Sequence, residues 1–298
     1  MTIKHIVLSG GGYKGFYSIG ALKYLAENNF YDIENIENIY GTSVGTIIGA
    51  ALCLKLNLSD ICEYVINKPW HKDFNFKIES LLDVYSKKGI INKSFIVSIF
   101  DNLLKSENLK QNITLKELYD KCNINFYIFV VNFTTYELVK LSHKTHPDLE
   151  LLEAIYMSCS LPFIFQPAYY NNECYIDGGV INPYPLNVCI ADLEKINPNI
   201  NKKEILGIEI ASDNLKPCSE DSSIIYFFYY TIRTLIQKNW GYKIKDKIPY
   251  EVYIPAKQYC AEDVKKVILS KEEIKNIVYQ GETYGKLFFL YQSKEQNL

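Results

Sequence analysis

A serine between two glycines is the residue of this sequence best suited to nucleophilic chemistry. Residues 41–45 are Gly-Thr-Ser-Val-Gly, so Gly41 and Gly45 flank Ser43 with one residue between on each side. This G-x-S-x-G pattern is typical of a nucleophile elbow, a strained turn from a strand into a helix where other backbone lies close to the serine. The dipole of a helix beginning there would stabilise negative charge near the serine Oγ. We therefore predict that Ser43 is a nucleophile, with an ordinary Gly-Ser turn as the alternative.

The positions of the histidines limit which residue can activate this serine. All four precede Asp177 in the chain: His5, His71, His143 and His146. An α/β-hydrolase has its triad in the order Ser, acid, His, and residues 147–298 contain no histidine, so that topology is excluded. His143 or His146 could serve in another topology, but their polar surroundings indicate an exposed loop.

Asp177 is the general base that the pattern favours. It ends a short apolar stretch and precedes Gly178 and Gly179, whose missing side chains let a substrate or another backbone approach. Asn182 and the prolines that follow indicate a rigid loop. An aspartate has an ordinary pKa of about 3.9, so it can serve Ser43 only in apolar surroundings and with a strongly stabilised oxyanion.

Three consecutive glycines could provide that stabilisation. Gly10, Gly11 and Gly12 follow an apolar stretch, and successive glycines expose backbone N–H groups that can point at an anion. Gly10, Gly12 and Gly15 also satisfy the G-x-G-x-x-G dinucleotide fingerprint, which makes a nucleotide-binding oxidoreductase the alternative. That fingerprint requires an acidic residue at the end of the second strand, where this chain has Ser43.

The elements expected around these residues form an α/β fold. Residues 3–8 predict a strand that leads through the glycines into a helix, and a second strand at 36–40 leads through Ser43 into another helix. Further strands are expected at 126–131, 137–141, 175–177, 205–210 and 251–254. Helices are expected at 148–158, 224–238 and 271–291, and residues 58–121 are mostly helical in pattern. The repeated strand-helix order predicts a central, mostly parallel sheet with helices on both faces.

Size and charge indicate how many domains the chain has and which partners it does not bind. The chain has 298 residues, and 32 basic against 34 acidic side chains give a net charge of −2. Because Arg233 is the only arginine, neither a strong positive field nor bidentate phosphate recognition is indicated, and we expect no nucleic-acid partner. We expect a single domain, 1–298, whose portion 212–298 is mostly helical.

Targeting and metal signals are missing from the sequence. The N-terminal segment lacks the apolar region of a signal peptide, and the longest apolar aromatic run, 224–230, is too short to cross a bilayer. That run, together with Trp240, could contact a membrane interface or form a core helix. The eight cysteines contain no C-x-x-C pair and no calcium-loop pattern is present, so we expect no metal and no cofactor. We expect a cytoplasmic protein, soluble or peripherally bound to membranes.

Four segments together resemble the patatin-like phospholipase family. They are residues 10–15 with the helix behind them, residues 41–45, residues 154–167, and residues 177–179 with Asn182 and Pro185. They occur in the family's order, and the resemblance covers about residues 4–211. It implies the patatin-like fold.

The resemblance implies a Ser-Asp dyad lipid acyl hydrolase. Ser43 would attack an ester carbonyl of a phospholipid or other lipid ester, Asp177 would take its proton, and the Gly10 to Gly12 loop would bind the oxyanion. Lys14 matches a basic position of the family and would contact a lipid phosphate, or else pair with carboxylates or with the loop itself. The implied partner is a transient membrane or micelle surface. A non-catalytic lipid-binding module is a further alternative, and nothing in the sequence indicates an oligomeric state.

Overall fold

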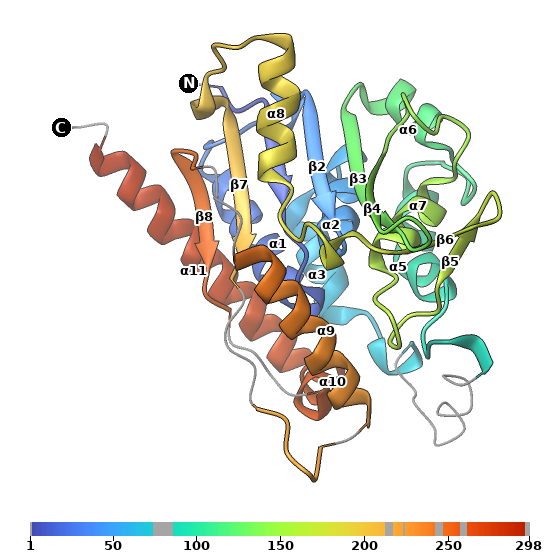
Figure 1. Ribbon diagram of the computed structural model, residues 1–298. Helices are drawn as coiled ribbons and strands as arrows, with labels where there is room; N and C mark the ends of the chain where they lie inside the picture. The colour runs from blue at the N-terminus through green and yellow to red at the C-terminus, as the bar shows by residue number, and fades with distance from the viewer. Residues whose placement is uncertain are drawn as a thin grey trace.

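One mixed sheet organises the molecule. The computed structural model describes residues 2–73, 86–211, 217–222, 224–241, 247–256 and 261–295, and within them eight strands form this sheet in the order β5-β6-β3-β2-β1-β7-β8, with β4 also paired to β3. Strands β3, β2, β1, β7 and β8 are parallel to one another, whereas β4 and β6 are antiparallel to β3 (Figure 1). The strands are β1 His5–Leu8, β2 Asn38–Thr42, β3 Asn125–Asn132, β4 Glu137–Leu141, β5 Ala168–Tyr170, β6 Glu173–Asp177, β7 Ile205–Ile210 and β8 Tyr250–Ile254. The predicted mostly parallel sheet is confirmed.

Alternating side chains of the central strands build two cores, because neighbouring residues of a strand point to opposite faces. Ile6 and Leu8 of β1 and Ile39 of β2 belong to a large core shared with helices α1, α2, α3 and α11. Val7 and Tyr40 point to the other face and pack against α8. The helices are α1 Gly15–Glu27, α2 Val44–Cys53, α3 Leu58–Asn67, α8 Leu186–Ile196 and α11 Lys271–Glu295. Figure 1 shows α8 in front of the sheet and α1, α2 and α3 behind it, so both faces are covered as predicted.

The remaining helices lie at the edges of this sandwich. Helices α5 Ser94–Ser106, α6 Leu115–Cys122 and α7 Leu151–Cys159 surround the part of the sheet made by β3 to β6. Helices α9 Ile224–Gly241 and α10 Ala261–Leu269 lie at the end of the sheet where β7 and β8 terminate (Figure 1). Among the described residues, no helix is both long enough and apolar enough to span a bilayer.

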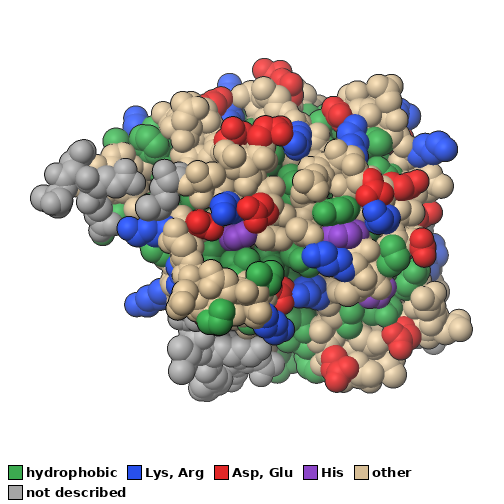
Figure 2. All heavy atoms as spheres, turned by 90° about the horizontal axis from the view of Figure 1, so that it is seen from above, with side chains coloured by type: hydrophobic (Ala, Val, Ile, Leu, Met, Phe, Trp, Pro, Cys, Tyr) green, Lys and Arg blue, Asp and Glu red, His purple; other side chains and the backbone are tan. Residues whose placement is uncertain are grey.

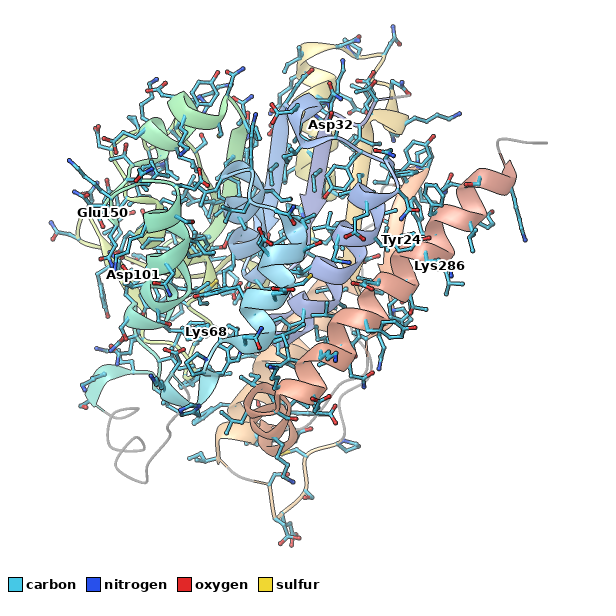
Figure 3. The ribbon with its side chains drawn as sticks, turned by 180° about the vertical axis from the view of Figure 1, so that it is seen from behind. Tyr24, Asp32, Lys68, Asp101, Glu150 and Lys286 are labelled. Carbon is cyan, nitrogen blue, oxygen red and sulfur yellow. The ribbon has the colours of Figure 1, made fainter. Side chains whose placement is uncertain are left out.

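Helices α1 and α11 pack parallel to one another at very short range. A Cβ on Gly281 would lie 2.1 Å from the Tyr17 carbonyl oxygen, and one on Gly285 would lie 2.8 Å from the carbonyl oxygen of Ala21. A Cβ on Gly20 of α1 would in turn lie 2.0 Å from the Val278 carbonyl oxygen. Glycine at these positions therefore lets the two backbones touch, and Figure 3 shows the helices side by side near the labelled Tyr24 and Lys286.

Charged side chains are mixed over the surface. Figure 2, which views the molecule from above Figure 1, shows acidic and basic groups interspersed on that face. Some ion pairs join neighbouring turns of one helix, such as Lys105 with Asp101 at 2.7 Å, and an exposed pair of this kind contributes little to stability.

The structure adds three elements that the sequence patterns did not predict and moves several expected boundaries by two to four residues. Helices α8 and α10 and strand β5 were not expected. The second strand begins at Asn38, two residues later than predicted, because the 3₁₀ turn Ile33–Asn35 precedes it, and it continues through Thr42, which pairs with Phe129. The single-domain organisation stays a prediction.

Candidate active site

Two strand ends meet beside β3 and bring Ser43 to Asp177. Thr42, the last residue of β2, pairs with Phe129, and Asp177, the last residue of β6, pairs with the next residue, Val130. Phe129 and Val130 both pair with β4 on their other side, so β2 and β6 occupy the same side of β3. Because β2 is parallel and β6 antiparallel to β3, their carboxyl ends face each other. Ser43 and Asp177 are therefore adjacent although 134 positions separate them.

Ser43 has the strained backbone of an elbow. Its φ of 54° and ψ of −127° lie where residues with a side chain are rare, which costs of order 1–3 kcal/mol. The strand-to-helix turn is held by hydrogen bonds to the Ser43 carbonyl oxygen from the Thr46 N–H at 2.8 Å and the Thr46 hydroxyl at 2.6 Å. Helix α2 begins at Val44, so its N-terminus is directed at the serine.

The Ser43 hydroxyl donates a hydrogen bond of 2.6 Å to Oδ2 of Asp177. The other oxygen, Oδ1, accepts the Gly179 N–H at 2.7 Å, which orients the carboxylate. Asp177 is buried and Ser43 is half-buried. The arrangement gives the serine a proton acceptor held in place on both sides, as nucleophilic catalysis requires.

The glycine loop lies directly against the elbow. A Cβ on Gly10 would lie 3.1 Å from the Ser43 Cβ, and the Gly10 N–H is engaged, donating to the Pro183 carbonyl oxygen at 2.7 Å. The N–H groups of Gly11 and Gly12 have no acceptor among the residues that the structure describes. Gly12 has a φ of +60° and open space around its Cα. Of the three predicted oxyanion donors, the last two are therefore the ones available to a substrate.

The other motif glycines permit close backbone packing around the dyad. A Cβ on Gly41 would lie 2.8 Å from the Gly45 carbonyl oxygen, and one on Gly45 would lie 2.5 Å from that of Leu8. The helix that follows the glycine loop starts at Gly15, where a Cβ would meet the Val44 side chain at 2.4 Å. A Cβ on Gly178 would likewise lie 2.2 Å from the Phe129 carbonyl oxygen.

Lys14 lies inside the molecule. Its side chain is buried, and its Nζ donates to the carbonyl oxygen of Ala256, which follows β8, at 3.3 Å. This contact ties the glycine loop to the C-terminal part of the chain. A contact between Lys14 and a lipid phosphate stays a prediction. The acceptor seen here, the Ala256 carbonyl oxygen, is neither a carboxylate nor part of the glycine loop, which were the alternatives.

Two serines near the end of α7 position the dyad and were not predicted as site residues. Ser158 Oγ accepts the Ser43 N–H at 3.0 Å and donates to the Phe129 carbonyl oxygen at 2.6 Å. The Ser160 carbonyl oxygen accepts the Asp177 N–H at 3.1 Å, and both serines are buried. They lie within residues 154–167, the segment that suggested the family resemblance. Two serines two positions apart in that segment were the available signal.

Burial dominates the electrostatics beside the dyad. Cys159 lies next to Ser43, Thr46 and Asp177, and burial raises the pKa of its thiol, so it stays protonated. Burial also raises the pKa of Tyr156 to about 12, and its hydroxyl donates to the Gln166 carbonyl oxygen at 2.7 Å. The described cysteines, residues 53, 62, 122, 159, 174, 189 and 218, are free, and Cys260 lies outside the described residues.

Three of the histidines contact residues other than Ser43 and Asp177. His5 begins β1, at the end of the sheet opposite the elbow, and its Nδ1 lies 2.8 Å from Asn38 Nδ2. His143 stacks on Tyr119 with ring centroids 3.8 Å apart, and His146 Nδ1 lies 2.9 Å from the Thr145 hydroxyl. His71 lies in the short 3₁₀ helix Trp70–Lys72.

The structure does not supply the acidic residue that the dinucleotide-binding alternative requires after the second strand. Where a dinucleotide-binding unit requires an acidic side chain after its second strand, the structure has Ser43. Within the described ranges, no three His, Cys, Asp or Glu side chains are grouped so as to hold a metal ion.

Comparisons with known proteins identify related sequences and a similar fold. A family model described as patatin-like phospholipase matches residues 6–190. The chain is 29% identical over 203 residues to a probable lipid hydrolase, 463L, of Invertebrate iridescent virus 6, covering 67% of each protein. It is 21% identical over 265 residues to the mouse 1-acylglycerol-3-phosphate O-acyltransferase Pnpla3, covering 86% of this chain and 58% of that protein. Among solved structures, VipD from Legionella pneumophila has a similar fold, with a TM-score of 0.54 and 16% identity over 97% of this chain and 67% of VipD.

Proposed function

Because the chain belongs to the patatin-like phospholipase family, we propose that it is a lipid acyl hydrolase that uses Ser43 as nucleophile and Asp177 as general base. The observation that carries this proposal is the 2.6 Å hydrogen bond from the serine hydroxyl to the carboxylate of Asp177. The lipid-hydrolase character of the family and of the viral relative supports it. The substrates are glycerophospholipids, lysophospholipids and short acyl esters.

The reaction follows from the contacts of the dyad. As Ser43 Oγ bonds to the ester carbonyl carbon, its proton moves to Asp177 Oδ2, and the carbonyl oxygen takes up the negative charge. The Gly11 and Gly12 N–H groups and the N-terminus of α2 stabilise that oxyanion. Collapse of the intermediate breaks the bond to the leaving alcohol, which takes the proton from Asp177.

Water completes the cycle. Asp177 Oδ2 removes a proton from a water molecule that attacks the acyl-serine, and the fatty acid leaves as Ser43 regains its proton. Throughout, the Gly179 N–H fixes the carboxylate, so that the same oxygen faces the serine in both halves of the reaction.

The test is hydrolysis of a lipid panel by the purified chain and by Ser43→Ala, Asp177→Asn and the double variant. Each single variant should lose at least about 10²–10⁴-fold in turnover, and the double variant should be scarcely worse, because the two groups act as a unit. Asp192→Asn is the control. This carboxylate lies on α8, where it pairs with Lys140 of β4 and not with Ser43. Additive losses, or a Ser43→Ala variant as active as the wild type, would contradict the proposal. Including lysophospholipid acceptors in the panel distinguishes hydrolysis from acyl transfer.

A further inference from the structure

Helix α9 lies across the end of the sheet that holds the dyad. It packs against the 3₁₀ turn Gly178–Val180, which begins directly after Asp177. Figure 1 shows it below the carboxyl ends of the parallel strands, where the elbow is. Anything that covers the outer face of α9 is therefore close to the site.

Three of the exposed side chains that the structure describes on α9 are apolar, and Thr231 between them is polar. Ile224, Phe227 and Leu235 are 62%, 54% and 57% exposed, and they recur at the spacing of one helical face, whereas Tyr226 points inward and is buried. Phe228 adjoins this face and is half-buried. Of the side chains in the run 224–230 that the structure describes, Ile224 and Phe227 are therefore exposed rather than part of a core. The Trp240 side chain lies outside the described residues.

A strained phenylalanine joins this stripe to the loop beside the dyad. Phe163 has a φ of 67°, a conformation unfavourable for a bulky residue, and it is 37% exposed. Its ring stacks on Phe228 with centroids 4.2 Å apart and planes 10° apart. Phe163 follows Ser160 by three residues, so the apolar surface is continuous with the segment that holds the Asp177 N–H. We refer to Phe163, Ile224, Phe227, Phe228 and Leu235 as the apolar patch.

Two exposed lysines lie in the segment that pairs with the loop carrying Phe163. Lys87 and Lys88 precede Ile90 and Ile91, whose N–H groups both donate to the Ile164 carbonyl oxygen, at 3.0 and 2.9 Å. This pairing fixes the lysines beside the loop that carries Phe163. Aromatic and aliphatic side chains next to lysines are the composition of a surface that enters the headgroup boundary of a bilayer.

We propose that the apolar patch docks the protein on a phospholipid surface, with Lys87 and Lys88 facing anionic headgroups. The choice of partner rests on the proposed function, because a lipid ester must leave a bilayer or micelle to reach Ser43. A second copy of the chain fits less well, since a stable dimer requires about 20–30 residues on each side and the patch has five.

The test measures vesicle binding without hydrolysis. The Ser43→Ala protein is floated with vesicles of ether-linked phosphatidylcholine, with and without 30% phosphatidylserine. In that background, Phe227→Ser with Leu235→Ser should weaken binding about 25-fold or more, because each side chain contributes about fivefold or more. The matched control replaces Tyr279 and Leu287 of α11, which are 67% and 59% exposed, by serine, and should bind unchanged. Lys87→Gln with Lys88→Gln should weaken binding about 5- to 25-fold on the anionic vesicles only.

Each result decides the docking proposal. Equal binding by the Phe227 and Leu235 variant and its parent, equal loss by the α11 control, or no binding of the Ser43→Ala protein would each overturn it. A dimer by sedimentation that the patch substitutions dissociate would overturn it in favour of a second copy. Should the Ser43→Ala protein bind through the patch while the wild type cleaves no ester, docking is upheld and the hydrolase proposal fails. Thermal unfolding of every variant shows whether it is folded.

Discussion

Ser158→Ala should show how far the position of Ser43, as distinct from the presence of its hydroxyl, determines the rate of hydrolysis. The Ser158 hydroxyl lies between the Ser43 N–H at 3.0 Å and the Phe129 carbonyl oxygen at 2.6 Å, at a fully buried position. Removing it leaves two buried polar groups without a partner, each costing about 1–3 kcal/mol. We therefore expect the free energy of unfolding to fall by about 2–4 kcal/mol.

The catalytic loss follows from the strain at Ser43. Without the bond to Ser158, the residue can relax from its φ of 54°, and its Oγ moves from its 2.6 Å contact with Asp177. A displacement of the order of 1 Å costs about 10²-fold in rate. Because Ser158 is a positioning residue that does not touch substrate, kcat should fall about 10- to 100-fold while KM stays within about twofold.

Ser160→Ala is the matched control for this experiment. Its hydroxyl donates to the Tyr156 carbonyl oxygen at 2.7 Å rather than to Ser43 or Asp177. The backbone contact from Ser160 to Asp177 survives the substitution. We expect this variant to keep kcat within about threefold and to lose about 1 kcal/mol of stability. Kinetics on a soluble short-chain ester and chemical denaturation measure both quantities. A folded Ser158→Ala protein with wild-type kcat, or equal kcat losses in the two variants, would refute the reasoning.

Three further predictions concern the histidines and the helix pair. Replacing all histidines by Gln together should keep hydrolysis and fluorophosphonate labelling of Ser43 within about tenfold, and loss of both in a folded protein would require a histidine base. Burial lowers the pKa of His5 below its usual 6.5, so the unfolded chain binds more protons below that pH and stability falls as the pH decreases. The melting temperature of His5→Gln should therefore depend less on pH between 7 and 5 than that of the wild type, and an unchanged slope would exclude His5 as the cause. Gly281→Ala should lower the free energy of unfolding by about 2 kcal/mol or more, because its Cβ would lie 2.1 Å from the Tyr17 carbonyl oxygen. Chemical denaturation measures this loss. The control Thr283→Ala, on the exposed face of α11, should change the free energy of unfolding by no more than about 0.5 kcal/mol.

Local patterns predicted the parts of the fold that depend on neighbouring residues. The hairpin of β3 and β4 was expected because two apolar stretches flank a polar turn, and Glu137–Leu141 is the second strand in the structure. The sheet class followed from the repeated strand-helix order. Helix α8 was not expected because the sequence before it is rich in proline, yet Pro185 serves as the residue that precedes its first turn.

Long-range pairing could not be predicted from the chain. That β6 runs antiparallel and ends at Val130 depends on its register with β3, which no local spacing encodes. The sequence patterns selected Ser43 and Asp177 as site residues, and the structure brings them together; their catalytic roles stay predictions. Ser158 was overlooked because its partner Phe129 lies 29 positions away. The burial of Lys14 depends on a contact with Ala256, 242 positions later.

The tight pairing of α1 with α11 has a consequence for how the protein is made. At a synthesis rate of about 5–20 residues per second, α11 emerges some 10–50 s after α1, since about 250 positions separate them. Until then Gly20 and the apolar side chains beside it have no cover, and the helix behind the glycine loop lacks its neighbour. The nascent chain therefore exposes an apolar surface behind the glycine loop until α11 has been made, which favours engagement by chaperones.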